Sequence, residues 1–285
     1  MQLLLILASM IWGINIVVMK VIMESLPMYL VAGVRVICSA IIVGVLLMIK
    51  KSFKKLSLRQ LGVVLLISFF NVSLNFYLSF TGIHLLKGSS TALINALNPV
   101  ITCVFSCVIL KQSFCRKTWI GVFLSFLGFM LSIRFDLSQL TTGTWFLLAS
   151  LASYSFSTIL VKKKGEDIPS LVISFYSLLF GAIQLLILSY FKEGLPIGLF
   201  VSLSLQDILL FLGFSICGFA FIQSIHLLAV DKIGPMSTSF YLNLNPIFTY
   251  LASIIFLKES IDMFQIIGFC IILCSLFIAR EKREL

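Results

Sequence analysis

Apolar residues occur along this chain in long continuous runs that short polar segments separate. A run of roughly 20 apolar residues lets a helix, which rises about 1.5 Å per residue, cross the hydrocarbon core of a bilayer. Continuous runs favour helices over the alternating strands of a β-barrel. The pattern predicts an all-α membrane protein with ten transmembrane helices, at residues 2–22, 28–49, 61–81, 88–110, 118–134, 142–161, 169–190, 208–228, 234–257 and 263–279.

Composition agrees with this pattern. The chain is 60% hydrophobic and 11% charged, with a mean hydropathy of +1.14, which leaves too little polar surface for a soluble domain of 285 residues. The connections between runs are short, so no separate soluble domain is expected. The first run lacks a basic segment before it and nine further runs follow, so we expect a retained helix rather than a signal peptide.

Basic residues predict the orientation. With the N-terminus inside, fifteen Lys and Arg fall in cytoplasmic loops and five on the other side. We therefore expect a multi-pass protein of a bacterial plasma membrane with both termini cytoplasmic. The formal net charge of +10 is explained by this bias and by anionic lipid headgroups, so the expected partners are the lipid bilayer and a small-molecule substrate, and not nucleic acid.

An internal repeat divides the chain. Residues 82–113 match residues 229–260 at an offset of 147, and the earlier part of each unit matches more weakly at an offset of 142. An odd number of crossings separates the copies, so the second must enter the bilayer from the opposite side. The sequence predicts two inverted five-helix repeats, residues 1–134 and 140–281. The pairs that carry the match are Ser90/Ser237, Thr91/Thr238, Leu97/Leu244, Asn98/Asn245, Pro99/Pro246, Thr102/Thr249, Lys111/Lys258, Trp12/Tyr154, Lys20/Lys162 and Pro27/Pro169.

The sequence resembles the EamA family of the drug/metabolite transporter superfamily over almost its whole length. The resemblance rests on the ten-span, two-unit layout, on IWGINIVVMK and VAGVRVICSA in the first two spans, and on LNP followed by a Lys-Gln/Glu-Ser stretch in each repeat. It implies a helical transporter that moves small metabolites, often outward. Tyr154 stands where the family commonly has tryptophan.

Two prolines identify the expected centre of the molecule. Pro99 and Pro246 each remove a backbone N–H near the middle of a span, which frees the carbonyl groups of Asn95 and Leu242 and makes these positions hinges. Broken backbone at membrane depth is tolerated where it is buried or lines a water-filled cavity. We expect two polar stripes to face each other there, formed by Thr91, Asn95, Asn98 and Thr102 in one repeat and by Thr238, Tyr241, Asn245 and Thr249 in the other. The alternative is that these side chains only cap the kinks or bond neighbouring helices.

Other polar and aromatic side chains in the spans are further candidates for substrate contact: Trp12, Asn15, Asn75, Tyr77, Tyr154, Thr158 and Tyr176. Arg35 is the one full charge well inside a span. It is a candidate for binding a carboxylate or phosphate, or for a structural role at a helix end. Small residues seven apart, Gly121/Gly128 and Gly268/Ser275, predict a close helix contact, either between the two units or in a homodimer.

Carboxylates are absent from the middle of every predicted span, because all eleven Asp and Glu fall in loops or at span ends. This disfavours Asp/Glu-based proton antiport and a cationic cargo. The spans also lack a carboxylate pair, a Cys/His pair or a metal cluster, so we expect no enzyme activity, no catalytic residue, no cofactor and no metal. We predict an exporter of amino acids or related neutral or zwitterionic solutes that works by alternating access. The alternatives are an uptake permease for a similar metabolite and a multidrug efflux carrier.

Overall fold

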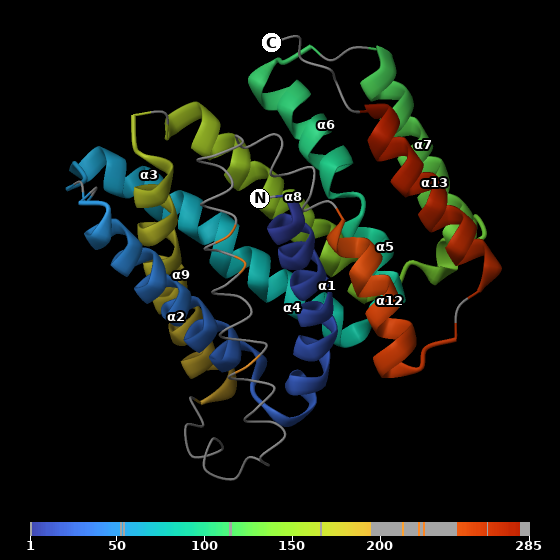
Figure 1. Cartoon of the computed structure of the whole chain (residues 1–285), viewed down its shortest axis with the longest axis horizontal. Helices are drawn as coiled ribbons and strands as arrows, with labels where there is room; N and C mark the ends of the chain where they lie inside the picture. Colours follow the sequence, from blue (N-terminus) through green and yellow to red (C-terminus); the bar gives the residue numbers. More distant parts are fainter. Residues whose placement is uncertain are drawn as a thin grey trace.

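The computed structural model describes residues 2–194 apart from 52, 54, 114, 115 and 166, the single residues 213, 222 and 225, and residues 244–279 apart from 261. Every regular element within these residues is a helix (Figure 1). The helices are α1 (Gln2–Ser25), α2 (Met28–Ile49), α3 (Leu58–Ser68), η1 (Phe69–Ser73), α4 (Leu74–Leu85), α5 (Gly88–Asn95), α6 (Asn98–Leu110), α7 (Arg116–Ser132), η2 (Leu137–Gln139), α8 (Thr142–Lys164), α9 (Ser170–Glu193), α12 (Asn245–Leu257) and α13 (Met263–Ala279).

Six helical stretches within the described residues are long and apolar enough to cross a membrane: Gln2–Glu24, Met28–Ile49, Leu58–Leu85, Gly88–Leu110, Thr142–Lys164 and Ser170–Glu193. Two shorter apolar helices follow, Asn245–Leu257 and Met263–Ser275. The run expected over 208–228 lies almost wholly outside the described residues, as does the first part of the run over 234–257. These lengths and compositions are those of a multi-pass membrane protein.

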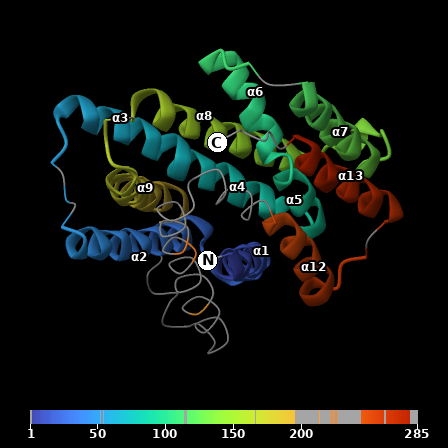
Figure 2. The same ribbon diagram turned by 45° about the horizontal axis from the view of Figure 1, so that its top comes forward.

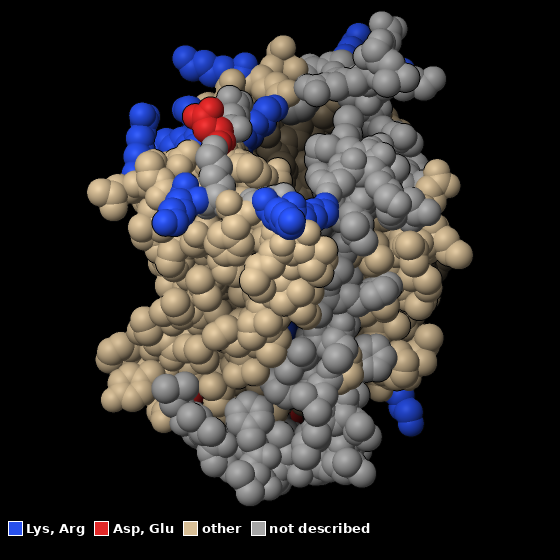
Figure 3. All heavy atoms as spheres, turned by 60° about the vertical axis from the view of Figure 1, so that its left-hand side comes forward, with Lys and Arg blue, Asp and Glu red and all other residues tan. Residues whose placement is uncertain are grey.

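Charged side chains mark the ends of the helices. Figure 3 shows Lys and Arg gathered at one end of the face it views, above a broad surface almost free of charge. This end, which we call the basic end, carries the exposed residues Lys50, Lys51, Lys55, Arg59, Lys162, Lys163 and Lys164. The other end carries Glu24, Glu193, Glu259 and Asp262, together with the exposed lysines Lys87, Lys192 and Lys258, and is called the acidic end below because most of the described acids lie there. A belt without charge between two charged ends suits a protein that lies in a bilayer.

Two helix pairs form the sides of the molecule. α2 packs along α9, and α7 packs along α13, and the two pairs lie on opposite sides in both ribbon views (Figures 1 and 2). Glycine permits the α7–α13 contact, because a Cβ atom on Gly128 would lie 2.7 Å from the carbonyl oxygen of Gly268. Ser125 and Ser275 share a hydrogen bond nearby. The small residues of α7 and α13 therefore join helices of one chain, so a homodimer would need a different surface.

The α2–α9 contact repeats itself along the chain. A Cβ atom on Gly33 would lie 2.7 Å from Cδ2 of Leu186, and a Cβ atom on Gly44 would lie 2.8 Å from Cε2 of Phe175. Residue 33 precedes residue 175 by 142 positions, and residue 44 precedes residue 186 by the same number. Each residue of one contact therefore has its equivalent, 142 positions away, in the other contact.

The third span is longer than expected and is not a regular helix. It runs from Leu58 to Leu85 and contains the π-helical turn η1 between α3 and α4. The start of α3 is fixed by a capping box, in which Ser57 accepts from the backbone N–H of Gln60 and the Gln60 side chain accepts from the backbone N–H of Ser57. A π-turn holds more residues than an α-helical turn, so it changes the direction in which the side chains of the following helix, α4, point.

Candidate functional site

The span expected over residues 88–110 is divided into two helices. α5 ends at Asn95, residues 96 and 97 form a turn, and α6 begins at Asn98 with Pro99 in its first turn. Proline is well suited to this position because the first N–H groups of a helix have no partner within it. α12 begins in the same way, at Asn245 with Pro246.

The two Asn-Pro helices also share their backbone geometry. Leu97 before α6 has φ −80° and ψ −6°, and Leu244 before α12 has φ −79° and ψ −14°. At the other end of each helix a lysine adopts the left-handed conformation, Lys111 with φ 53° and Lys258 with φ 51°. Residues 147 apart in the chain thus start and end equivalent helices.

Asn98 and Asn245 each hold a polar atom that has no hydrogen-bond partner among the described residues. Within the described part of the chain, the Oδ1 atoms of both are buried and accept no hydrogen bond. Both residues are half-buried, so the other atoms of each side chain retain some exposure. A buried acceptor without a donor is costly, and in native proteins such atoms call for a specific explanation.

Each Asn-Pro helix packs against a helix from a distant part of the chain, α12 against α1 and α6 against α8. Gly13 of α1 lies so close to α12 that a Cβ atom would meet the carbonyl oxygen of Asn245 and the backbone nitrogen of Thr249, both at 2.7 Å. On the other side, the hydroxyls of Thr102 in α6 and Ser155 in α8 are hydrogen-bonded at 2.8 Å. Residues 13 and 155 are 142 apart, and residues 102 and 249 are 147 apart. The part of α1 that holds Trp12 and Asn15 therefore lies close to the start of α12. The part of α8 that holds Tyr154 lies close to α6, the helix that follows the turn at residues 96 and 97.

Several candidates are engaged in contacts within the protein. Thr91 is fully buried, and its hydroxyl donates to the carbonyl of Lys87 at 3.0 Å. Asn75 Nδ2 donates to the carbonyl of Ser150 at 2.9 Å and so joins α4 to α8. Thr158 donates to the carbonyl of Tyr154, one turn earlier in α8, at 3.1 Å. Asn75 thus bonds a neighbouring helix, whereas the hydroxyls of Thr91 and Thr158 bond carbonyl groups four residues earlier.

The three tyrosine candidates differ in their surroundings. Tyr154 is 40% exposed. The ring of Tyr77 stacks on Tyr29 with 5.5 Å between centroids. Tyr176 contacts the rings of Phe53, Phe175 and Phe180 and packs against a core cluster separate from the one that holds residues 92–97. The structure thus does not bring Tyr176 to the breaks.

The remaining predicted residues are placed as follows. Arg35 is a buried residue of α2, with 7% of its surface exposed. Asn95 is the half-buried last residue of α5. Thr238 and Tyr241 lie outside the described residues, so the second polar stripe is represented there by Asn245 and Thr249. Thr249 is fully buried and donates to the carbonyl of Asn245 at 3.1 Å.

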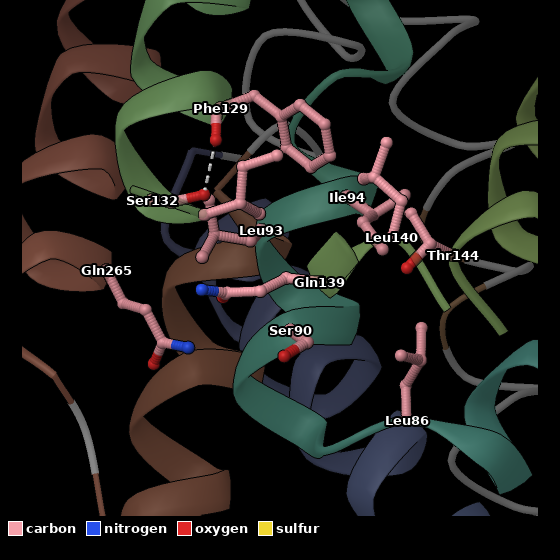
Figure 4. Close-up of a pocket in the computed structure, with 11 residues that line it drawn as sticks. Leu86, Ser90, Leu93, Ile94, Phe129, Ser132, Gln139, Leu140, Thr144 and Gln265 are labelled. Carbon is pink, nitrogen blue, oxygen red and sulfur yellow. Dashed lines mark hydrogen bonds between the residues drawn. The ribbon is translucent and has the colours of Figure 1, made fainter. Parts of the chain in front are cut away.

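A small cavity lies among α5, α7, η2, α8 and α13 (Figure 4). Gln139 and Gln265 extend toward each other in this view, and Ser90 and Thr144 add hydroxyls to the lining. Its volume of about 60 Å³ corresponds to roughly two water molecules, so it is too small for a metabolite. It contains none of the predicted site residues.

Two carboxylates act in a way that the sequence analysis missed. Glu193 accepts hydrogen bonds from the backbone N–H groups of Tyr29 and Leu30 at the start of α2, both at 3.0 Å. Glu259 accepts from the backbone N–H groups of Gly88 and Ser89 at the start of α5, at 2.7 and 2.9 Å. Glu193 is the last residue of α9 and Glu259 lies just after α12, but the sequence contains no signal for which distant helix start each one caps.

All Asp and Glu within the described residues lie in loops or at helix ends: Glu24, Asp136, Asp167, Glu193, Glu259 and Asp262. Asp262 pairs with Arg134 at 2.7 Å, on the exposed surface at the acidic end. Among the described residues, no group of three or more His, Cys, Asp or Glu could hold a metal ion. Within the described residues, the middle of each span therefore contains no Asp or Glu.

The chain is similar to known proteins along its whole length. The sequence profile of the EamA-like transporter family matches residues 1–134 and again residues 141–280. "Uncharacterized transporter YetK" of Bacillus subtilis (strain 168) is 25% identical over 97% of this chain and 86% of its own length. "Uncharacterized transporter YvbV" of the same organism is 24% identical over 96% and 89%.

A more distant relative and a solved structure extend this comparison. "Protein PecM" of Dickeya dadantii (strain 3937) is 22% identical over 74% of this chain and 71% of its own length. A protein of known crystal structure has the same fold, with a TM-score of 0.66 at 12% identity, over 99% of this chain and 98% of that one. The double match to one family, together with the apolar helices and the full-length transporter relatives, confirms the resemblance seen in the sequence: this chain is a multi-pass membrane transporter that belongs to the EamA-like transporter family.

Proposed function

We propose that this transporter consists of two five-helix units, residues 1–134 and 140–281, which cross the membrane ten times in all and in opposite orientations. The contacts Gly33–Leu186 and Gly44–Phe175 support this arrangement, because each residue of one contact is equivalent, 142 positions away, to a residue of the other. When a two-fold axis relates two helices, every contact between non-equivalent positions occurs twice in this way. An inverted repeat with broken helices at matching positions is the architecture of many secondary transporters.

The substrate site lies at the two Asn-Pro breaks. The observation that carries this proposal is a pair of buried oxygens, Asn98 Oδ1 and Asn245 Oδ1, which lie at equivalent positions of the two units and accept no hydrogen bond from the described residues. Both atoms are hydrogen-bond acceptors, so a solute that carries N–H donors would satisfy them. A bound solute would thereby remove a cost that the empty protein bears.

The chemistry of the surroundings narrows the class of solute. The acidic residues of the described chain lie at helix ends and in loops, away from the breaks, so a solute with a net positive charge would find no counter-ion there. An amino acid or a related neutral or zwitterionic metabolite fits better, since its amino group offers donors to the two amides. We propose that such solutes cross by alternating access, with the hinges at Pro99 and Pro246.

The direction we favour is export from the cytoplasm of a bacterium. The basic end faces the cytoplasm, as the positive-inside rule requires, and both termini lie on that side. An uptake permease for a similar metabolite and a multidrug efflux carrier are the alternatives. No feature of the described residues specifically favours either alternative. A cationic drug would also lack a carboxylate partner at the breaks.

Counterflow in vesicles tests this proposal. Purified protein is reconstituted with an unlabelled solute inside, and entry of the labelled solute is followed for amino acids, amines, nucleosides and organic anions. We expect saturable counterflow of one or more neutral amino acids, and a loss of at least tenfold in both Asn98→Leu and Asn245→Leu. Asn75→Leu is the matched control, because that amide already bonds to Ser150. Unchanged counterflow in both folded variants would show that the site is elsewhere.

A further inference from the structure

The helix α5 has no cap of its own. The residue before it is Lys87, whose side chain has no acceptor and makes no capping hydrogen bond. The free N–H groups at the start of α5 are bonded instead by Glu259, which follows α12 in the other repeat. Glu259 also accepts from the hydroxyl of Ser89 at 2.7 Å. One carboxylate from the second unit thus makes three hydrogen bonds to one helix start of the first.

The surroundings of this contact are closely packed. Ser89 and Ser253 are fully buried, and a Cβ atom on Gly88 would lie 2.8 Å from Cβ of Ser253 in α12. α5 and α12 lie side by side in both ribbon views (Figures 1 and 2). α5 is only eight residues long and is separated from α6 by the turn at residues 96 and 97. A short helix bounded by a break is suited to move as a unit relative to α12.

The equivalent position in the first unit has different chemistry. Gln112 lies 147 residues before Glu259, and each follows a left-handed lysine in the same turn. The backbone N–H of Gln112 donates to the carbonyl of Ser106, and that of Glu259 to the carbonyl of Ser253, both at 3.4 Å. The turns match, yet only the acidic end has a carboxylate here. A carboxylate binds a helix N-terminus more strongly than an amide does, because it meets the positive end of the helix dipole.

We propose that Glu259 is a latch that holds the acidic end of the transporter closed, by fixing the N-terminus of α5 to the C-terminal end of α12. The acidic end opens only when the three hydrogen bonds to Glu259 break. This role rests on the alternating access proposed above. The contact itself is measurable without any solute, so the latch and the transport function are tested separately.

Hydrogen exchange measures the latch directly. In purified protein in lipid nanodiscs, we expect Glu259→Gln to accelerate amide exchange at Gly88 and Ser89 by about tenfold or more, since the loss of a charge-assisted cap lowers the cost of local opening. Exchange in the interior of α7 and α13 should not change. Equal exchange at Gly88 and Ser89 in wild type and Glu259→Gln would overturn the proposal.

Thiol labelling tests whether the end opens. Ser253→Cys, in a background without the native cysteines, places a thiol in the buried contact beneath Glu259. We expect a membrane-impermeant maleimide to react with it several-fold faster after Glu259→Gln. Unchanged labelling, with faster exchange at Gly88, would show that Glu259 is a helix cap and not a latch.

Glu193→Gln is the matched control. Glu193 makes the same kind of contact to the start of α2, at the same end of the molecule, but α2 and α9 also pack along their lengths. This variant should accelerate exchange at Tyr29 and Leu30 and leave the labelling of Ser253→Cys unchanged. An equal rise in labelling in both variants would show that Glu259 has no special role in closing the acidic end. Both measurements remain valid even if counterflow finds no transported solute.

Discussion

Gly128 of α7 and Gly268 of α13 meet backbone to backbone, and a Cβ atom on either one would collide with the carbonyl oxygen of the other. Backbone atoms cannot move aside as the end of a flexible side chain can. Ser125 and Ser275 bond to each other in the same interface. Close approach of this kind gains van der Waals contacts that larger residues would prevent. The crossing therefore fixes how the two repeats join on one side of the molecule.

Enlarging this crossing should destabilise the protein. We expect Gly128→Leu to lower the free energy of unfolding by about 2 kcal/mol or more, because overpacking here forces backbone to shift. Thermal unfolding of the solubilised protein measures the effect. Gly62→Ala is the control, since nothing lies within 4 Å of a Cβ atom at Gly62. An equal loss of stability in both variants would contradict the structural role of the crossing.

The paired glycines of α2 predict two unequal effects. Gly33→Ala would meet Cγ of Leu186 at 2.9 Å, whereas Gly44→Ala would meet only the ring edge of Phe175, which can rotate. We expect Gly33→Ala to cost about 1–3 kcal/mol and Gly44→Ala less. Leu186→Ala should cost less stability in the Gly33→Ala background than in the wild type, because it removes the side chain that the new methyl group meets. A double variant no more stable than the sum of the single effects would show that this contact is not the cause.

Replacing Asn98 or Asn245, the asparagines at the two breaks, should reduce transport without reducing stability. Asn98→Leu and Asn245→Leu remove buried acceptors that have no donor among the described residues, so we expect the free energy of unfolding to stay constant or to rise. Asn75→Leu should lower it by about 1 kcal/mol, because the hydrogen bond to Ser150 is lost. Thermal unfolding of the three variants makes this comparison. A marked loss of stability in Asn98→Leu and Asn245→Leu would favour a structural role for these amides.

Transport should not require a proton gradient. The acidic residues of the described chain lie in loops and at helix ends, so no carboxylate there is placed to carry a proton past the breaks. We expect solute flux in vesicles to persist after an ionophore collapses the gradient. The matched measurement uses the same vesicles with an imposed gradient. A strict dependence of flux on that gradient would contradict the expectation that transport is not coupled to protons.

Much of the helical architecture could be predicted from the sequence. Continuous apolar runs predict helices without tertiary information, and α1, α2, α8 and α9 begin and end within a few residues of the expected bounds. The division between α5 and α6 follows from the chemistry of Pro99 alone. Glycines were harder to interpret, because the spacing of seven between Gly121 and Gly128 and between Gly268 and Ser275 predicts close contact but does not identify the partner surface.

The polar side chains were less predictable, since helical spacing does not reveal what a hydroxyl or carboxylate bonds. Thr91 shares a helix face with Asn95, yet its hydroxyl is bonded to the carbonyl of Lys87 and it lies fully buried. Glu259 looked like a residue at a span end, and its role depends on a helix start 170 residues away in the chain. Such long-range pairs follow from tertiary packing and not from local pattern.

The opposite orientation of the two units is the central claim, and one labelling experiment tests it most directly. Lys111 and Lys258 are exposed, occupy the same left-handed turn of their respective units, and lie 147 residues apart. In a background without native cysteines, a membrane-impermeant thiol reagent added to intact cells should label Lys258→Cys at once and label Lys111→Cys only after permeabilisation. Labelling of both positions from the same side of the membrane would contradict the account.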